Sequence, residues 1–274
     1  MQRRDARQRL RSLATKPVTI VVIVVLLLGV AAGITAKLRS PGVSSQCQRA
    51  FIPAYFPASV WSQAAGTKPP PSAMILNPAT GVGAGGAPSP DYQAAAQQAR
   101  DAGSAVLGYS STADGLRPVR QVEADVRNYK AWYGVTGIFL DSVNGVSSDF
   151  PYYQQLSSYI RKNIPGASIW LNPGIYPDQQ YMSLGNVVVV FEGTYAQYRA
   201  AQIPGWAHGF PATRFANTIY GATSAQAISA IGLSRSRNTS YLYVTNLTGA
   251  NPYDALPSYW SAETAALDTG CGGQ

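Results

Sequence analysis

The sequence predicts an α/β protein: a single (β/α)8 TIM barrel preceded by one N-terminal transmembrane helix. Two observations predict the barrel. Short apolar runs recur eight times along the chain, and segments with the composition of helices lie between them. A third observation, an uncharged stretch near the N-terminus, predicts the transmembrane helix.

The uncharged stretch covers residues 18–36. At 1.5 Å per residue, a helix of this length nearly spans a hydrocarbon core of ~30 Å. Because basic residues crowd the preceding segment, we expect a cytoplasmic tail (1–17), a membrane-spanning signal anchor (18–36), a linker (37–46) and an extracytoplasmic barrel domain (47–274). The alternative is a signal peptide cleaved near Ala36, which would release a secreted domain.

The charge of the chain is concentrated before the barrel. Residues 1–40 hold eight of the 21 Lys and Arg residues and one of the 13 acids, which leaves 13 bases against 12 acids. The predicted domain is therefore close to neutral and has no basic surface for phosphates, so we expect no nucleic-acid partner.

Two cysteines, Cys47 and Cys271, bracket the predicted domain. In an exported protein they are expected to form one disulfide at the bottom of the barrel, and two unpaired buried thiols are the alternative. The chain has a single histidine, His208, so we expect no metal site and no cofactor.

The apolar runs predict eight strands, and the segments between them predict helices. Val119, Val122, Val126 and Tyr129 follow helical spacing. An open doubly wound sheet is the alternative, but no glycine-rich phosphate turn follows the first run. We interpret the glycines of residues 81–86 as a loop at the rim. The predicted strands are Phe51–Phe56, Ala73–Leu76, Ala105–Tyr109, Gly137–Leu140, Ser168–Leu171, Val187–Phe191, Arg214–Tyr220 and Tyr241–Val244, and the other predicted helices are Asp91–Arg100, Ser224–Leu233 and Ser258–Leu267.

Two of the apolar runs end in a single acid. Asp141 follows Gly137–Leu140, and Glu192 follows Val187–Phe191. Catalytic residues of parallel barrels lie at the carboxyl ends of the strands, so we predict that this pair is catalytic. A buried structural role is the alternative for each carboxylate.

Other polar or aromatic residues lie near the ends of the predicted strands. Aromatic faces pack on the C–H faces of sugar rings, and two carboxylates are what glycoside hydrolysis needs. Asn77 and Asn172 each precede a proline, for which turn formation is the alternative. The predicted substrate-binding residues are Tyr55, Asn77, Tyr109, Asn172, Tyr195, Asn217 and Asn246.

Four segments, in this order and spacing, resemble the spherulin-4 family of (β/α)8 proteins, which includes fungal galactosaminogalactan hydrolases. They are Ala54-Tyr55-Phe56 followed by Trp61, Ile75 to Gly83, Val106 to Thr112, and Trp132 to Asp141. The resemblance covers roughly residues 50–270. It implies an endo-acting glycosidase on α-1,4-linked galactosamine or N-acetylgalactosamine polymers that uses no metal.

In the family, the motif of the fourth strand ends in Asp-Glu, and another Glu ends the sixth strand. Asp141 and Glu192 match the first and last of these acids, whereas Ser142 stands at the position of the second. The main hypothesis is therefore a monomeric surface glycosidase. One alternative is a membrane-anchored polysaccharide binder that has lost turnover, which Ser142 favours. Another is an enzyme that acts on the cell's own envelope glycans.

Overall fold

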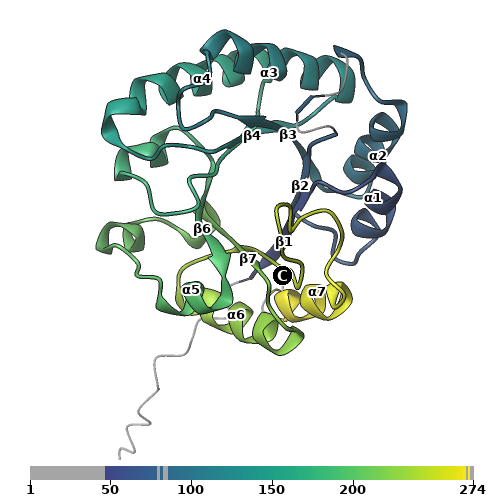
Figure 1. Ribbon diagram of the computed structural model, residues 1–274, viewed down its shortest axis with the longest axis vertical. Helices are drawn as coiled ribbons and strands as arrows, with labels where there is room; N and C mark the ends of the chain where they lie inside the picture. The colour runs from purple at the N-terminus through teal and green to yellow at the C-terminus, as the bar shows by residue number, and fades with distance from the viewer. Residues whose placement is uncertain (1–46, 79–80, 83–85, 270, 272–274) are drawn as a thin grey trace, which may run out of the picture. The chain divides into compact units, whose positions relative to one another are not determined.

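The computed structural model describes residues 47–78, 81–82, 86–269 and 271. These residues form a closed barrel in which each of eight strands pairs in parallel with the next, and β8 pairs with β1 (Figure 1). The predicted barrel and its strand order are confirmed. The strands are β1 (Arg49–Ala54), β2 (Ala73–Leu76), β3 (Ala105–Ser111), β4 (Gly137–Asp141), β5 (Ser168–Leu171), β6 (Val187–Thr194), β7 (Phe215–Tyr220) and β8 (Tyr241–Val244).

Helices cover the outer face of the barrel and alternate with the strands, with one exception. Between β5 and β6 the chain forms a short 3-10 helix, Gln179–Ser183, in place of an α-helix. The α-helices of the described residues are α1 (Ala58–Ala65), α2 (Pro90–Asp101), α3 (Val119–Tyr133), α4 (Phe150–Asn163), α5 (Tyr195–Ala200), α6 (Ser224–Ser236) and α7 (Trp260–Asp268).

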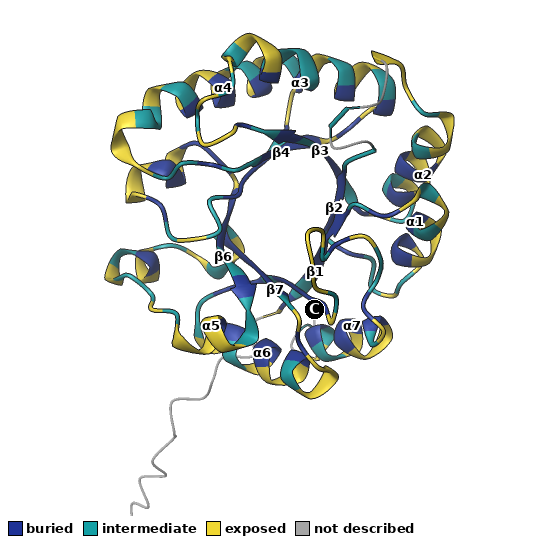
Figure 2. Ribbon diagram, viewed as in Figure 1, coloured by how far each residue is buried: buried dark blue, intermediate teal, exposed yellow. Residues whose placement is uncertain are grey.

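The burial pattern explains why these sequences form a barrel. The strands are almost entirely buried, and the helices bury one face and expose the other (Figure 2). On α3 the buried residues include Val122, Val126 and Tyr129, as their helical spacing predicts. The helix packs closely because β3 has a glycine beneath it: a Cβ atom on Gly108 would lie 2.4 Å from Cγ of Tyr129.

The two cysteines join the ends of the domain. Cys47 precedes β1, Cys271 follows α7, and the two form a disulfide across 224 residues of sequence. The start of β1 and the end of α7 lie at the amino-terminal side of the strands, so the bond is at the bottom of the barrel, as predicted. In the chain-entropy picture, closing a loop of this size stabilises the fold by up to ~5 kcal/mol.

The predicted tail (1–17), membrane span (18–36) and linker (37–46) lie outside the described residues, as does part of the glycine loop at 81–86. Within the residues that are described, no helix combines the length and the apolar character that a membrane span needs.

Candidate active site

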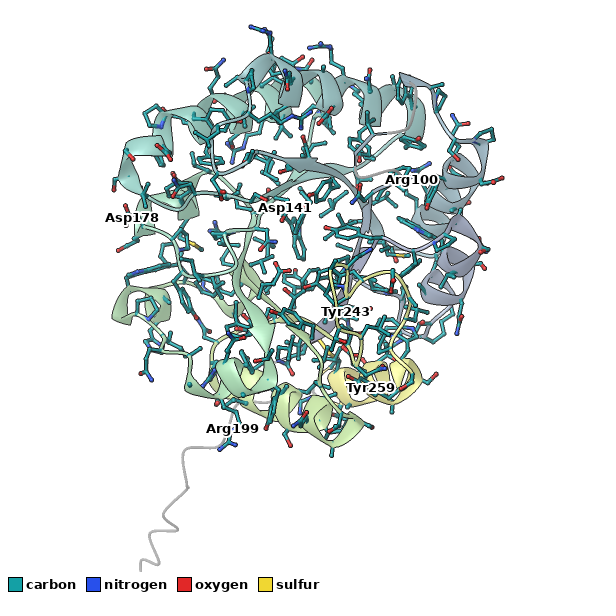
Figure 3. All side chains as sticks on the ribbon, viewed as in Figure 1. Arg100, Asp141, Asp178, Arg199, Tyr243 and Tyr259 are labelled. Atoms are coloured by element: carbon teal, nitrogen blue, oxygen red, sulfur yellow. A yellow bond between two sulfur atoms is a disulfide. The ribbon has the colours of Figure 1, made fainter. Side chains whose placement is uncertain are left out.

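Asp141 is the last residue of β4, and its side chain points into the ring of strands (Figure 3). Phe139, two residues earlier, lines the same cavity, as the alternation of side chains along a strand requires. The main-chain oxygen of Asp141 accepts hydrogen bonds from the amide and the hydroxyl of Thr112, at 2.9 and 3.0 Å. These bonds hold the end of β4 in place beside β3.

Glu192 reaches the same cavity because β6 contains a β-bulge. The pairing of β6 with β7 shifts between Val189 and Phe191, so that Val190 is an extra residue. Val189 and Glu192 both face the cavity, whereas Phe191 packs on Tyr198 of α5 at a centroid distance of 4.9 Å. Regular alternation from Val189 would have turned Glu192 toward the helices, so the bulge aims this carboxylate inward.

One amide connects the two carboxylates. Nδ2 of Asn172, directly after β5, donates to Oδ1 of Asp141 at 2.7 Å and to Oε2 of Glu192 at 2.8 Å. The amide of Gly174 donates to Oδ1 of Asn172 at 3.1 Å and so fixes which end of the side chain faces the carboxylates. Since the two N–H bonds of an amide diverge by about 120°, the two carboxylate oxygens lie about 5 Å apart.

Each carboxylate also accepts a hydrogen bond from one tyrosine. The hydroxyl of Tyr109 donates to Oδ2 of Asp141 at 2.8 Å, and that of Tyr253 donates to Oε1 of Glu192 at 2.6 Å. Burial, together with the adjacent carboxylate, raises the pKa of Tyr109 and of Tyr253 above the usual value for tyrosine. Both phenols therefore stay protonated and act as donors at physiological pH.

A third tyrosine packs between these two. The ring of Tyr55 lies edge-on to Tyr109 at 5.4 Å and to Tyr253 at 5.8 Å between centroids. Burial and, next, the Asp141 carboxylate raise the pKa of Tyr55. Tyr55 thus supports both phenols that hold the carboxylates.

The carboxylates line a cavity of about 460 Å³ at the carboxyl ends of the strands. This volume is within the range of small-molecule sites, ~300–1,000 Å³. No Lys, Arg or His side chain is among its described lining residues. The loop between β8 and α7 forms one wall of the cavity. The lining residues are Phe51, Pro53, Tyr55, Asn77, Tyr109, Phe139, Asp141, Asn172, Val189, Glu192, Thr218, Tyr220, Gly249, Ala250, Asn251, Pro252 and Tyr253.

Four of the predicted substrate-binding residues line this cavity: Tyr55, Asn77, Tyr109 and Asn172. Asn77 has a buried Oδ1 atom without a hydrogen-bond partner among the described residues. Asn172 does more than the sequence indicated, because it joins the two carboxylates.

The structure corrects the placement of the other three. Asn217 faces the helices, where its Nδ2 donates to the hydroxyl of Tyr198 at 2.9 Å. Asn246 is exposed, and its Oδ1 accepts the amide of Ser258 at 2.8 Å. Tyr195 begins α5 and does not line the cavity. Asn217 lies within β7, and Tyr195 and Asn246 follow the ends of β6 and β8, but none of the three side chains lines the cavity.

Thr218 and Tyr220 are the residues of β7 that line the cavity, so the cavity-facing position of this strand is one residue later than the predicted Asn217. Tyr253 is not among the residues that the sequence predicted for the site. Its contact with Glu192 comes from a loop 61 residues further along the chain, and no local pattern indicates it.

Ser142 adopts a left-handed backbone conformation, with φ of 50°. The end of β4 therefore curls, and the hydroxyl of Ser142 lies 3.5 Å from Oδ2 of Asp141. Strand alternation alone would have placed adjacent side chains on opposite faces. The curl brings position 142 to the same side as Asp141.

A closed (β/α)8 barrel with two carboxylates in a cavity at the carboxyl ends of its strands has the architecture of glycoside hydrolases. The chain belongs to spherulation-specific family 4, whose sequence profile matches residues 50–267. It is 29% identical over 246 residues to Spherulin-4 from Physarum polycephalum, a match that covers 82% of this chain and 71% of that protein.

Two solved structures share the fold. Sph3 from Aspergillus clavatus, in complex with GalNAc, superposes with a TM-score of 0.71 at 20% identity and covers 81% of this chain and 98% of its own. An alpha-amylase from Geobacillus thermoleovorans, complexed with acarbose, has a TM-score of 0.52 at 12% identity, with coverages of 83% and 78%. Both likenesses are to the barrel fold.

Proposed function

We propose that this protein is a glycoside hydrolase that cleaves within polysaccharides of α-1,4-linked galactosamine or N-acetylgalactosamine. Asp141 acts as the nucleophile or stabilises the developing positive charge, and Glu192 acts as the general acid and base. The observation that carries the proposal is the carboxylate pair that Asn172 holds about 5 Å apart in the cavity. The fold shared with Sph3, which was solved with GalNAc, supports the amino sugar as substrate.

The chemistry follows from the two carboxylates. One protonates the departing glycosidic oxygen while the other attacks or stabilises the anomeric carbon of an oxocarbenium-like transition state. Carboxyl groups ~5–5.5 Å apart leave no room for an intervening water and favour retention, whereas inversion needs ~6.5–9.5 Å. The two oxygens that Asn172 bonds lie about 5 Å apart, nearer the first range than the second, and on this ground we propose retention of configuration.

The test is release of reducing ends from partly deacetylated galactosaminogalactan by purified 41–274 protein. Asp141→Asn and Glu192→Gln are nearly isosteric, and each should lower the rate by roughly 10²–10⁴. The anomer of the first product, observed by NMR before it mutarotates, should have the configuration of the substrate. Cleavage at the wild-type rate by both variants would contradict the assignment of Asp141 and Glu192 as catalytic residues. A first product of inverted configuration would contradict the retaining mechanism.

The second candidate function is a polysaccharide-binding protein without turnover, which Ser142 favours. A carboxylate at this position would lie beside Asp141, because the curl at the end of β4 points position 142 toward it. If cleavage needs the second acid of the Asp-Glu motif, Ser142→Glu should raise a weak or absent cleavage rate. The wild-type protein should then bind the polymer in a sedimentation assay. Efficient cleavage by the wild type would exclude this candidate.

The location of the enzyme belongs to the same proposal. The basic flank and the uncharged residues 18–36 support a cell-membrane anchor with a cytoplasmic N-terminus and an extracytoplasmic catalytic domain. A polysaccharide substrate outside the cell fits this topology.

A further inference from the structure

We propose that Tyr253, on the loop between β8 and α7, is the positioning residue of Glu192. Its hydroxyl fixes the carboxylate in the cavity. The inference rests on the proposed glycosidase function for its meaning in catalysis, but its physical content can be measured without substrate.

The contact is short and part-buried, and aromatic rings support the tyrosine from two sides. The Tyr253 hydroxyl lies 2.6 Å from Oε1 of Glu192, and the residue is 7% exposed. Its ring packs on Tyr55 at 5.8 Å and on Tyr243 at 6.2 Å between centroids. These contacts leave the ring little freedom, so the hydroxyl is held at the carboxylate.

The two carboxylates differ in what holds them. Main-chain bonds and Asn172 hold both residues, but the phenol that bonds Asp141 comes from a strand, β3. Glu192 depends on a phenol from a loop, whose turn is closed by the bond from the amide of Tyr253 to Oδ1 of Asn251 at 3.1 Å. Loss of the Tyr253 hydroxyl would therefore leave Glu192 with Asn172 as its remaining side-chain donor among the described residues.

A hydrogen bond donated to a carboxylate favours its charged form. Removing the donor lets the carboxyl keep its proton to a higher pH. For a charge-assisted bond, the expected upward shift is about one pH unit. The other titratable groups that line the cavity around Glu192 are Asp141, Tyr55, Tyr109 and Tyr220.

The chain is well suited to a direct measurement because it has three glutamates, Glu123, Glu192 and Glu263. Protein labelled with ¹³C at the glutamate carboxyl gives three signals, and Glu192→Gln identifies the one from Glu192. The pH titration of that signal is compared between wild type and Tyr253→Phe, which keeps the ring and its packing. Tyr259→Phe is the matched control, because Tyr259 lies at the end of the same loop but donates to the main-chain oxygen of Ala222 at 2.9 Å.

We expect the Glu192 midpoint to rise by about one pH unit in Tyr253→Phe and to coincide with wild type in Tyr259→Phe. A midpoint in Tyr253→Phe that coincides with wild type would overturn the inference. A shift of equal size in both variants would also overturn it, because it would reflect a general change in the loop.

Activity provides a second readout, separate from the first. On a polymer that the wild type cleaves, Tyr253→Phe should move the alkaline limb of the kcat/KM profile to higher pH, since a general acid must be protonated. Failure of the wild type to cleave any amino-sugar polymer would contradict the proposed function while leaving the NMR result intact. An unmoved NMR midpoint beside normal cleavage would contradict the inference alone.

Discussion

Replacing Asn172 by Asp tests whether the shared amide controls the site. The substitution keeps the shape of the side chain but converts a double donor into an acceptor. It would introduce a third carboxylate, one oxygen of which would lie 2.7 Å from Oδ1 of Asp141 and 2.8 Å from Oε2 of Glu192. At an effective dielectric constant of 20, two unit charges at such a distance repel by about 6 kcal/mol.

The site can relieve this repulsion by binding a proton. Like charges raise the pKa of the introduced carboxyl, which is protonated below the raised value and can then donate to one of its neighbours. The activity of Asn172→Asp should therefore be highest at acidic pH and should be lost as pH rises through that value. At pH 7 we expect kcat/KM to fall by roughly 10²–10³, since a misplacement of 1 Å costs about 10².

The assay is kcat/KM from reducing-end release between pH 4 and 8, with thermal unfolding to confirm the fold. Asn144→Asp is the matched control, because Nδ2 of Asn144 donates to Oδ2 of Asp149 at 2.7 Å outside the cavity. It introduces the same like-charge contact away from the catalytic pair, so its pH profile should match wild type. The reasoning would be refuted by an Asn172→Asp profile that superposes on the wild-type profile.

Three further predictions concern stability and topology. The double variant Cys47→Ser with Cys271→Ser should unfold at a lower temperature than oxidised wild type, with a loss in the free energy of unfolding of at most ~5 kcal/mol. Reducing agent should lower the unfolding temperature of the wild type only. Gly108→Ala should destabilise the fold by at least ~1–3 kcal/mol in denaturant titrations, because its Cβ would overlap the ring of Tyr129, while Gly205→Ala, with nothing within 4 Å, should not. In cells that express the full chain, external protease should digest the domain in spheroplasts, and resistance to it would exclude the predicted topology.

Periodicity predicted the barrel well, because each strand and most helices bury a face that the sequence displays. The carboxylates were found for the same reason: a single charge at the end of an apolar run is conspicuous in a chain with 12% charged residues. The direction of a side chain at a strand end was harder to predict. Asn217 and Thr218 are adjacent and both polar, so the alternation of polar and apolar residues does not show which of them faces the cavity. The hydrogen bond to Tyr198 turns Asn217 toward the helices, and Thr218 lines the cavity.

The sequence does not indicate the backbone feature that turns Glu192 into the cavity. Val187 to Phe191 is apolar at every position, so nothing in the run indicates that Val190 is an extra residue. The bulge is a property of how β6 pairs with β7, and it becomes visible only in the register of the two strands. The absence of an α-helix between β5 and β6 is of the same kind, because short polar segments do not distinguish a 3-10 helix from a loop.

The carboxyl-terminal side of the barrel departs from regular strand geometry at two positions near the carboxylates, and each departure changes the direction of a side chain. The bulge at Val190 turns Glu192 inward, and the left-handed Ser142 brings its hydroxyl beside Asp141. A regular barrel strand presents every second residue to the cavity, which would leave Asp141 without Glu192 as its partner. The two carboxylates come within reach of one amide because β6 breaks that alternation, and Asn172, which bonds to both, is the residue through which their spacing is set.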